Sequence, residues 1–160
     1  MKENLPKILI SSCLLGENVK YDGKNNLIKD PILNKLKKIA SLIPICPEVM
    51  GGLSIPRTPA EQQNQKVIDK NARDVTAEFI KGADISFDLA NNNNAIAAIL
   101  KERSPSCGVH QIYDGTFSKI PINGMGVTTK LLIQNGIKVF NENELRDCIE
   151  WLILNRYTQP

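Results

Sequence analysis

The sequence predicts a three-layer α/β fold, in which a mostly parallel sheet of about four strands is flanked by helices and carries a small β-hairpin. Short apolar segments alternate along the chain with segments whose apolar residues recur every three to four positions. Such alternation is typical of strands that pair in parallel under a cover of helices. The 160 residues fit one domain spanning 1–160, and the 42% of apolar residues suffice for a core.

Four short apolar segments are the expected strands, and two of them end directly before a cysteine. The first is followed by Cys13 and the second by Cys46. The four strands are expected over residues 7–12, 41–45, 95–100 and 137–140. Residues 112–117 read as a hairpin that turns on Asp114-Gly115.

Capping signals place the helices between these strands. Asp30 followed by Pro31 predicts a helix start, because Asp caps free N–H groups and Pro suits the first helical position. Asp74 is the expected cap of a long helix with an apolar face. Residues 127–134 form a helix that ends at Asn135-Gly136.

The last helix is expected to open on a capping box. Asn141 and Glu144 have the required spacing, and Cys148 falls on the apolar face that follows, where it is expected to be a core residue.

Residues 47–59, with two glycines and several prolines, are expected to be loop. Gly16 and Gly51-Gly52 are expected to supply positive φ, and the segment 124–126 is either an anion-binding helix start or a tight turn.

Charge and hydropathy exclude several classes of protein. The net charge is +3, from 20 basic and 17 acidic side chains, so no nucleic acid duplex is expected as a partner. No apolar run approaches the ~18 to 20 residues that span a bilayer, and no targeting segment is visible. We therefore expect a cytoplasmic protein without a membrane partner, whose thiols are reduced.

Three of the four cysteines are expected to meet at one edge of the sheet. Ligands of open α/β sheets bind outside the carboxyl ends of the strands, and Cys13, Cys46 and Cys107 follow three such ends. Three thiolates and His110 would make a zinc site. A 4Fe–4S cluster would instead keep one iron without a protein ligand, open to a substrate atom. Buried packing and a sulfur carrier with one low-pKa thiol are the further alternatives.

At these positions the sequence resembles the thiouracil desulfurase family, over nearly the whole chain. The resemblance rests on segments in fixed order, which are Ser12-Cys13-Leu14-Leu15-Gly16, Tyr21-Asp22-Gly23, Cys46-Pro47-Glu48-Val49, Gly51-Gly52-Leu53, Pro56-Arg57, Pro59-Ala60-Glu61, Asp74-Val75-Thr76, Gly82-Ala83, Leu100-Lys101, Arg103-Ser104-Pro105-Ser106-Cys107-Gly108, Tyr113-Asp114-Gly115-Thr116-Phe117 and Gly126-Val127-Thr128.

The resemblance implies an iron–sulfur enzyme. It implies a 4Fe–4S cluster held by Cys13, Cys46 and Cys107, and removal of sulfur from a thiolated base or nucleoside such as thiouracil, giving the oxo base and sulfide without net redox change. Glu48 and Ser104 carry over as the catalytic pair. Glu48 would take a proton from the attacking water, and Ser104 would hydrogen-bond the substrate or relay a proton. The alternative role of Ser104 is a turn before Pro105.

Three further side chains are weaker candidates. Arg57 and Arg103 would orient a carbonyl-rich base, or pair structurally with Glu61 or Asp22. Tyr21 would stack on a nucleobase, or pack in the core.

Overall fold

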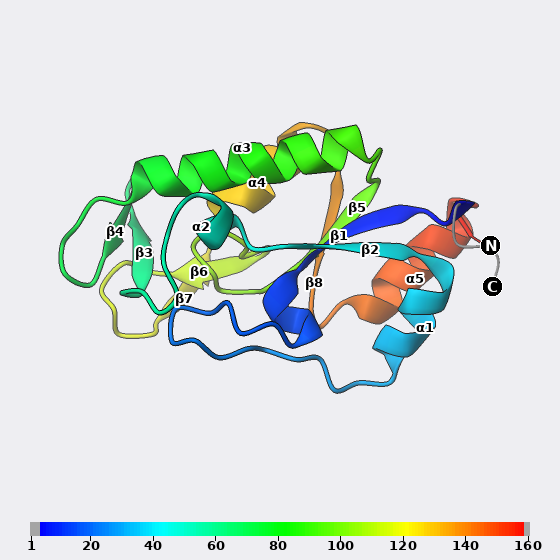
Figure 1. The fold of residues 1–160 in the computed structure, drawn as a ribbon, viewed down its shortest axis with the longest axis horizontal. Coiled ribbons are helices and arrows are strands. Elements are labelled where there is room, and N and C mark those ends of the chain that lie inside the picture. The colour runs from blue at the N-terminus through cyan, green and yellow to red at the C-terminus, as the bar shows by residue number, and fades with distance from the viewer. Residues whose placement is uncertain (1–3, 159–160) are drawn as a thin grey trace.

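The computed structural model describes residues 4–158, and a four-stranded parallel sheet lies at its centre (Figure 1). The strand order is β2-β1-β5-β8. Ser11 lies opposite Ile45 in the register, and Leu100 lies opposite Asn141. The strands are β1 (Lys7–Ser11), β2 (Ser41–Ile45), β5 (Ala97–Leu100) and β8 (Lys138–Asn141). The predicted α/β class with a parallel sheet and flanking helices is confirmed.

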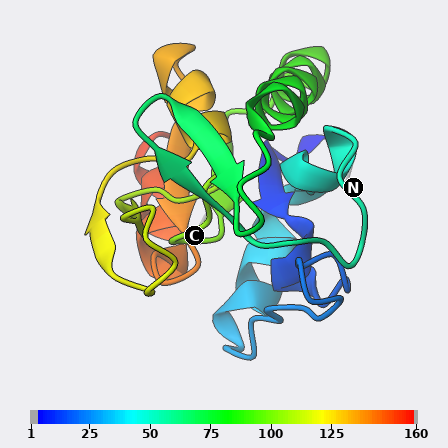
Figure 2. The same cartoon turned by 90° about the vertical axis from the view of Figure 1, so that its left-hand side faces the viewer.

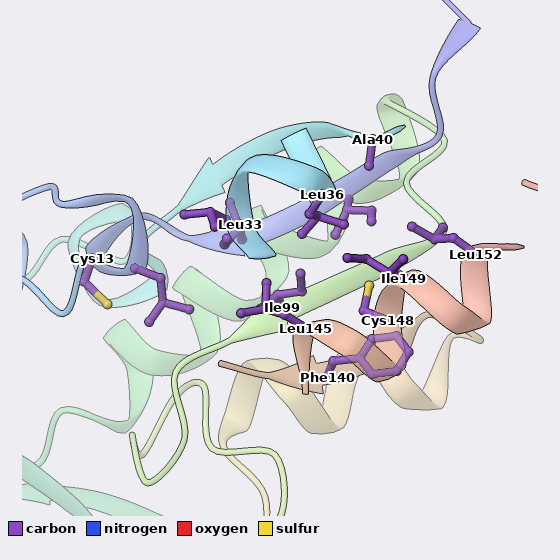
Figure 3. Close-up of a cluster of buried hydrophobic side chains, with 14 residues drawn as sticks. Cys13, Leu33, Leu36, Ala40, Ile99, Phe140, Leu145, Cys148, Ile149 and Leu152 are labelled. Carbon is purple, nitrogen blue, oxygen red and sulfur yellow. The ribbon is translucent and has the colours of Figure 1, made fainter. Parts of the chain in front are cut away.

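Alternate residues of the central strands face two different helix layers, because successive side chains of a strand point to opposite sides. Ile8, Ile10 and Ile99 pack with α1 (Ile32–Ile39) and α5 (Leu145–Leu154). Cys148 is fully buried in this cluster, as expected, and Figure 3 shows it between Ile149 and Phe140.

The other face of the sheet is covered by α3 (Thr76–Asn92) and α4 (Val127–Gln134), which lie side by side in Figure 1. Leu9, Ala98 and Leu100 point to this side and pack with side chains of both helices. Cys107 belongs to this second cluster, whereas Cys13 borders the first. The two cysteines therefore approach the end of the sheet from its two faces.

The predicted cap residues bind N–H groups at two helix starts, but each lies one position before the N-cap, which is Pro31 in α1 and Val75 in α3, and a third cap differs in detail. The carboxylates of Asp30 and Asp74 accept the N–H groups of Ile32 and Thr76, each at 2.9 Å. Glu144 accepts the N–H of Asn141 at 2.9 Å, which is one half of the expected capping box. The other half is absent, because the Asn141 carboxamide oxygen accepts the N–H of Asn143 instead, and α5 begins only at Leu145.

The short elements at the end of the sheet differ most from expectation. The segment 47–59 is not all loop, since α2 (Pro47–Met50) occupies its start, and η2 (Ser12–Leu15) follows β1. Two antiparallel hairpins are present instead of one, β3 (Ala60–Gln63) with β4 (Lys66–Asp69) and β6 (Gln111–Tyr113) with β7 (Pro121–Asn123). Figure 2 shows the β3–β4 hairpin in front, beside the yellow loop after β6.

The second hairpin is longer than predicted. Asp114-Gly115 opens a loop over 114–120 rather than forming a two-residue turn, because the Glu61 carboxylate of β3 accepts the N–H groups of Gly115 and Phe117. Within residues 4–158 no helix is both long and apolar enough to cross a membrane.

Candidate functional site

A pocket of about 600 Å³ opens at the carboxyl ends of β1, β2 and β5. Cys13, Cys46 and Cys107 line it, and so do Glu48 and Ser104. The residues that the sequence singled out on three separate segments are therefore brought to one place. Their roles as ligands and catalytic groups stay predictions.

Each cysteine reaches the pocket from a different element. Cys13 lies in η2, directly after β1, and its side chain is at the end of the first apolar cluster (Figure 3). Cys46 joins β2 to α2, and Cys107 lies in the turn beyond β5. All four cysteines of the chain are free thiols. Burial raises the pKa of Cys13 and Cys46 and raises that of Cys107 to about 12.

The thiols are not arranged around a single ion. Among residues 4–158, no group of three or more His, Cys, Asp or Glu side chains could hold one metal ion. His110, the expected fourth zinc ligand, is absent from the pocket lining, and its Nε2 lies 3.0 Å from Oε1 of Glu144. The described residues therefore do not provide the four ligands at one point that structural zinc takes.

Neighbouring side chains hydrogen-bond or touch two of these sulfurs. The side-chain N–H of Asn26 donates to Sγ of Cys13 at 3.5 Å, and its backbone N–H donates to the Cys13 carbonyl at 2.9 Å. The Ser11 hydroxyl accepts the N–H of Lys101 at 3.0 Å and lies against the Cys107 thiol. Sequence reasoning did not find Asn26, because it reaches Cys13 from a loop whose path no local pattern reveals.

Glu48 is a half-buried carboxylate tied to Arg57. Nε of Arg57 lies 3.3 Å from Oε1 of Glu48, and the same guanidinium donates to the carbonyls of Val19 at 2.9 Å and Ser54 at 3.2 Å. Burial raises the pKa of Glu48, and the charge of Arg57 opposes this rise without cancelling it. A carboxyl group with a raised pKa is suited to exchanging protons near neutral pH.

Two glycines bring α2, and with it Glu48, against α3. A Cβ on Gly51 would collide with the carbonyl of Glu78, and a Cβ on Gly82 would collide with the carbonyl of Pro47. Gly51 has φ −76°, so the expectation of positive φ is wrong for it, while it holds for Gly52 and Gly16. The reason for Gly51 is this close approach of two backbones.

The Cys107 turn is fastened to the start of α4. The N–H groups of Val127 and Thr128 donate to the carbonyls of Pro105 and Ser106 at 3.0 and 2.9 Å, and the Thr129 hydroxyl donates to the Cys107 carbonyl at 2.9 Å. These bonds use the N–H groups at the helix start, so the anion-binding alternative for residues 124–126 is wrong. A Cβ on Gly126 would collide with Ser106, which explains the glycine there.

Ser104 supports the same turn. Its Oγ accepts the N–H groups of Ser106 at 3.1 Å and Cys107 at 3.0 Å. The turn-forming alternative is thus realised, and the hydroxyl hydrogen is still available as a donor to a pocket ligand.

Glu102 is a buried carboxylate that sequence reasoning missed. Its Oε1 accepts the N–H groups of Arg103, Val109, His110 and Gln111. Its Oε2 accepts the side-chain N–H of Asn141 at 2.6 Å. Burial raises the pKa of Glu102, but the hydrogen bonds from Gln111, Asn141, His110 and Val109 outweigh it and hold the pKa below its usual range. Glu102 therefore gathers the two ends of the segment that contains Ser104 and Cys107.

The weaker candidates lie at the pocket, with different partners from those expected. Arg57 pairs with Glu48, while Asp22 pairs with Lys20, so the expected partners of Arg57 are wrong. Arg103 lines the pocket, and its Nε donates to Gln111 at 3.3 Å. Tyr21 lines the pocket with 42% of its surface exposed, so the core-packing alternative is wrong.

Comparison with known proteins gives concordant results. The family model described as 2-thiouracil desulfurase matches residues 8–144. The uncharacterized protein YbbK of Bacillus subtilis (strain 168) is 41% identical over 152 residues, which cover 89% of this chain and 99% of the relative. The solved structure of a [4Fe-4S]-dependent thiouracil desulfidase, TudS, is 43% identical, with a TM-score of 0.89 over 93% of this chain and 99% of that one.

Proposed function

Since this chain belongs to the 2-thiouracil desulfurase family, we propose that it is a [4Fe–4S]-dependent thiouracil desulfidase. The reaction consumes one water, breaks the C=S bond of the thiolated base and releases the oxo base and sulfide, with no electron transferred. The observation that carries the proposal is that Cys13, Cys46 and Cys107 line one pocket together with Glu48.

The residues present fit the cluster. Three thiols from separate segments reach the pocket, and among the described residues its lining contains no fourth cysteine and no histidine. Cys13, Cys46 and Cys107 would hold the cluster, and one of its four irons would then have no protein ligand. When bound, the cluster supplies that iron as a Lewis acid for the soft thiocarbonyl sulfur.

Glu48 is the proposed general base. Its carboxylate lies in the pocket lining, two positions after Cys46, and Arg57 fixes its orientation through the 3.3 Å ion pair. The carboxylate takes a proton from the water that attacks the thiocarbonyl carbon. Burial keeps the pKa of Glu48 raised, so the proton can be returned when sulfide leaves.

Ser104 is the proposed hydrogen-bond donor to the substrate. Two backbone N–H groups occupy its oxygen as an acceptor, so the hydroxyl hydrogen is directed away from the turn. That hydrogen would be donated to the carbonyl oxygen of the base, or relay a proton during the collapse of the tetrahedral adduct.

A sulfide-release assay tests the proposal. Anaerobically reconstituted protein is incubated with 2-thiouracil, 4-thiouracil and thiolated nucleosides, without any reductant, and sulfide and oxo base are both measured. We expect equal amounts of the two products from at least one thiolated pyrimidine, and none from chelator-treated protein. Fully iron-loaded protein that releases no sulfide from any of these compounds would refute the proposal.

A further inference from the structure

Phe117 is an aromatic side chain that lines the pocket from an unusual backbone conformation. It lies in the loop 114–120 and has a φ of +58°, in the left-handed region that a bulky residue rarely adopts. Such conformations cost free energy and persist only where the surroundings impose them, most often at functional sites. The positive φ of Phe117 therefore needs contacts that hold it, and it suggests a functional role for this residue.

The cause is an anchor on the neighbouring hairpin. Glu61 of β3 is buried, with 7% of its surface exposed, and its Oε1 accepts the N–H groups of Gly115 at 3.0 Å and Phe117 at 3.1 Å. The Gln63 side chain donates to the carbonyl of Gly115 at 2.8 Å. A Cβ on Gly115 would crowd the carbonyl of Gln62, so the loop is pressed against β3. A buried carboxylate that accepts two backbone N–H groups fixes the loop strongly, because bonds to a charged acceptor are the stronger kind.

Core packing does not explain Phe117. None of the three apolar clusters of the described residues includes it, although it is half-buried. Phe117 instead lines the pocket, together with Cys107 and Glu48. An aromatic residue with a strained backbone conformation therefore lines the pocket.

We propose that Phe117 binds the substrate by stacking its ring on the planar heteroaromatic ring of the thiolated base, and that Glu61 is the residue that positions it. This inference rests on the proposed function, because it assumes a flat thiolated base in the pocket. Stacking on an aromatic side chain contributes to the binding of any base, because every base has a π-face. The ring would hold the base in place while Glu48 and Ser104 act on it.

Steady-state kinetics on the iron-loaded enzyme test this inference. Phe117→Leu keeps apolar bulk and removes the aromatic face, so we expect KM for the thiolated base to rise roughly 5- to 100-fold, with kcat changed less than about threefold. Phe117→Tyr should keep KM within about threefold of wild type. Tyr157→Leu, at an exposed aromatic residue outside the pocket lining, is the matched control and should leave KM unchanged.

The positioning role of Glu61 is tested by a double-mutant cycle. Glu61→Ala should raise KM as Phe117→Leu does, and the double variant should be no worse than either single one, because both changes remove the same contact. Phe117→Gly, which suits the left-handed conformation, should raise KM without loss of the cluster absorbance. Unchanged KM in Phe117→Leu, or additive effects in the double variant, would overturn the inference, whereas absent turnover in wild type would instead overturn the proposed function.

Discussion

We expect the hydrogen bonds to the Glu102 carboxylate to matter most for keeping the Cys107 segment in place. Glu102→Gln preserves size and shape but removes the charge, and it places an NH₂ group where one acceptor oxygen was. At the Oε2 position that NH₂ group would face two donors, the side-chain N–H of Asn141 at 2.6 Å and the N–H of His110 at 3.2 Å.

The expected loss follows from the number of bonds affected. A hydrogen bond to a charged group contributes about 1.5 to 3 kcal/mol, and two such bonds at Oε2 are lost, so Glu102→Gln should lower the free energy of unfolding by about 3 to 6 kcal/mol. Urea unfolding of anaerobically purified protein, followed by circular dichroism, measures this value. The exposed Glu150→Gln is the matched control and should change stability by less than about 0.5 kcal/mol.

The pH dependence gives an independent check on Glu102. The pKa of Glu102 is lower in the folded chain than in the unfolded chain, where it is about 4.3. The contribution of Glu102 to stability is therefore complete above this unfolded value. It is lost as the pH falls through the folded pKa, because the unfolded chain then binds the proton first. Wild type should therefore lose this stability in acid while Glu102→Gln does not. A loss below about 1 kcal/mol at pH 7, or the same acid dependence in both proteins, would refute the reasoning.

Three further substitutions give distinct outcomes. Glu48→Gln should lower kcat by roughly 10²- to 10⁴-fold with full iron content, and near-normal turnover would remove Glu48 as the base. Ser104→Ala removes an acceptor of the Cys107 N–H as well as a donor, so we expect lower kcat and faster iron loss, with rescue of iron retention by Ser104→Thr. Gly82→Ala should lower stability by about 1 to 3 kcal/mol in a thermal melt and reduce turnover, since α2 is displaced, whereas Lys81→Ala on the same helix should do neither.

The sheet could be predicted because its signals are local. Apolar runs end at Cys13 and Cys46, and the caps at Asp30 and Asp74 separate helices from strands. The parallel pairing then forces the strand ends to one edge, which is why the convergence of the cysteines could be inferred before the structure was known.

The supports of the site could not be predicted, because they are long-range contacts to the backbone. Glu61 and Glu102 bind N–H groups far along the chain, and no residue pattern marks which N–H a carboxylate will meet. The short helix α2 was missed because Gly51 and Gly52 around it read as loop, whereas Gly51 serves the close packing on α3.

The central claim is that the thiols of Cys13, Cys46 and Cys107 hold an iron–sulfur cluster at the pocket, and that Cys148 takes no part. Its most direct test is the iron and acid-labile sulfide content, with the visible absorbance, of four reconstituted variants, Cys13→Ala, Cys46→Ala, Cys107→Ala and Cys148→Ala. We predict about four irons per chain in wild type and in Cys148→Ala, and loss of the intact cluster in each of the other three. A full cluster in any of those three, or its loss in a folded Cys148→Ala, would contradict the claim.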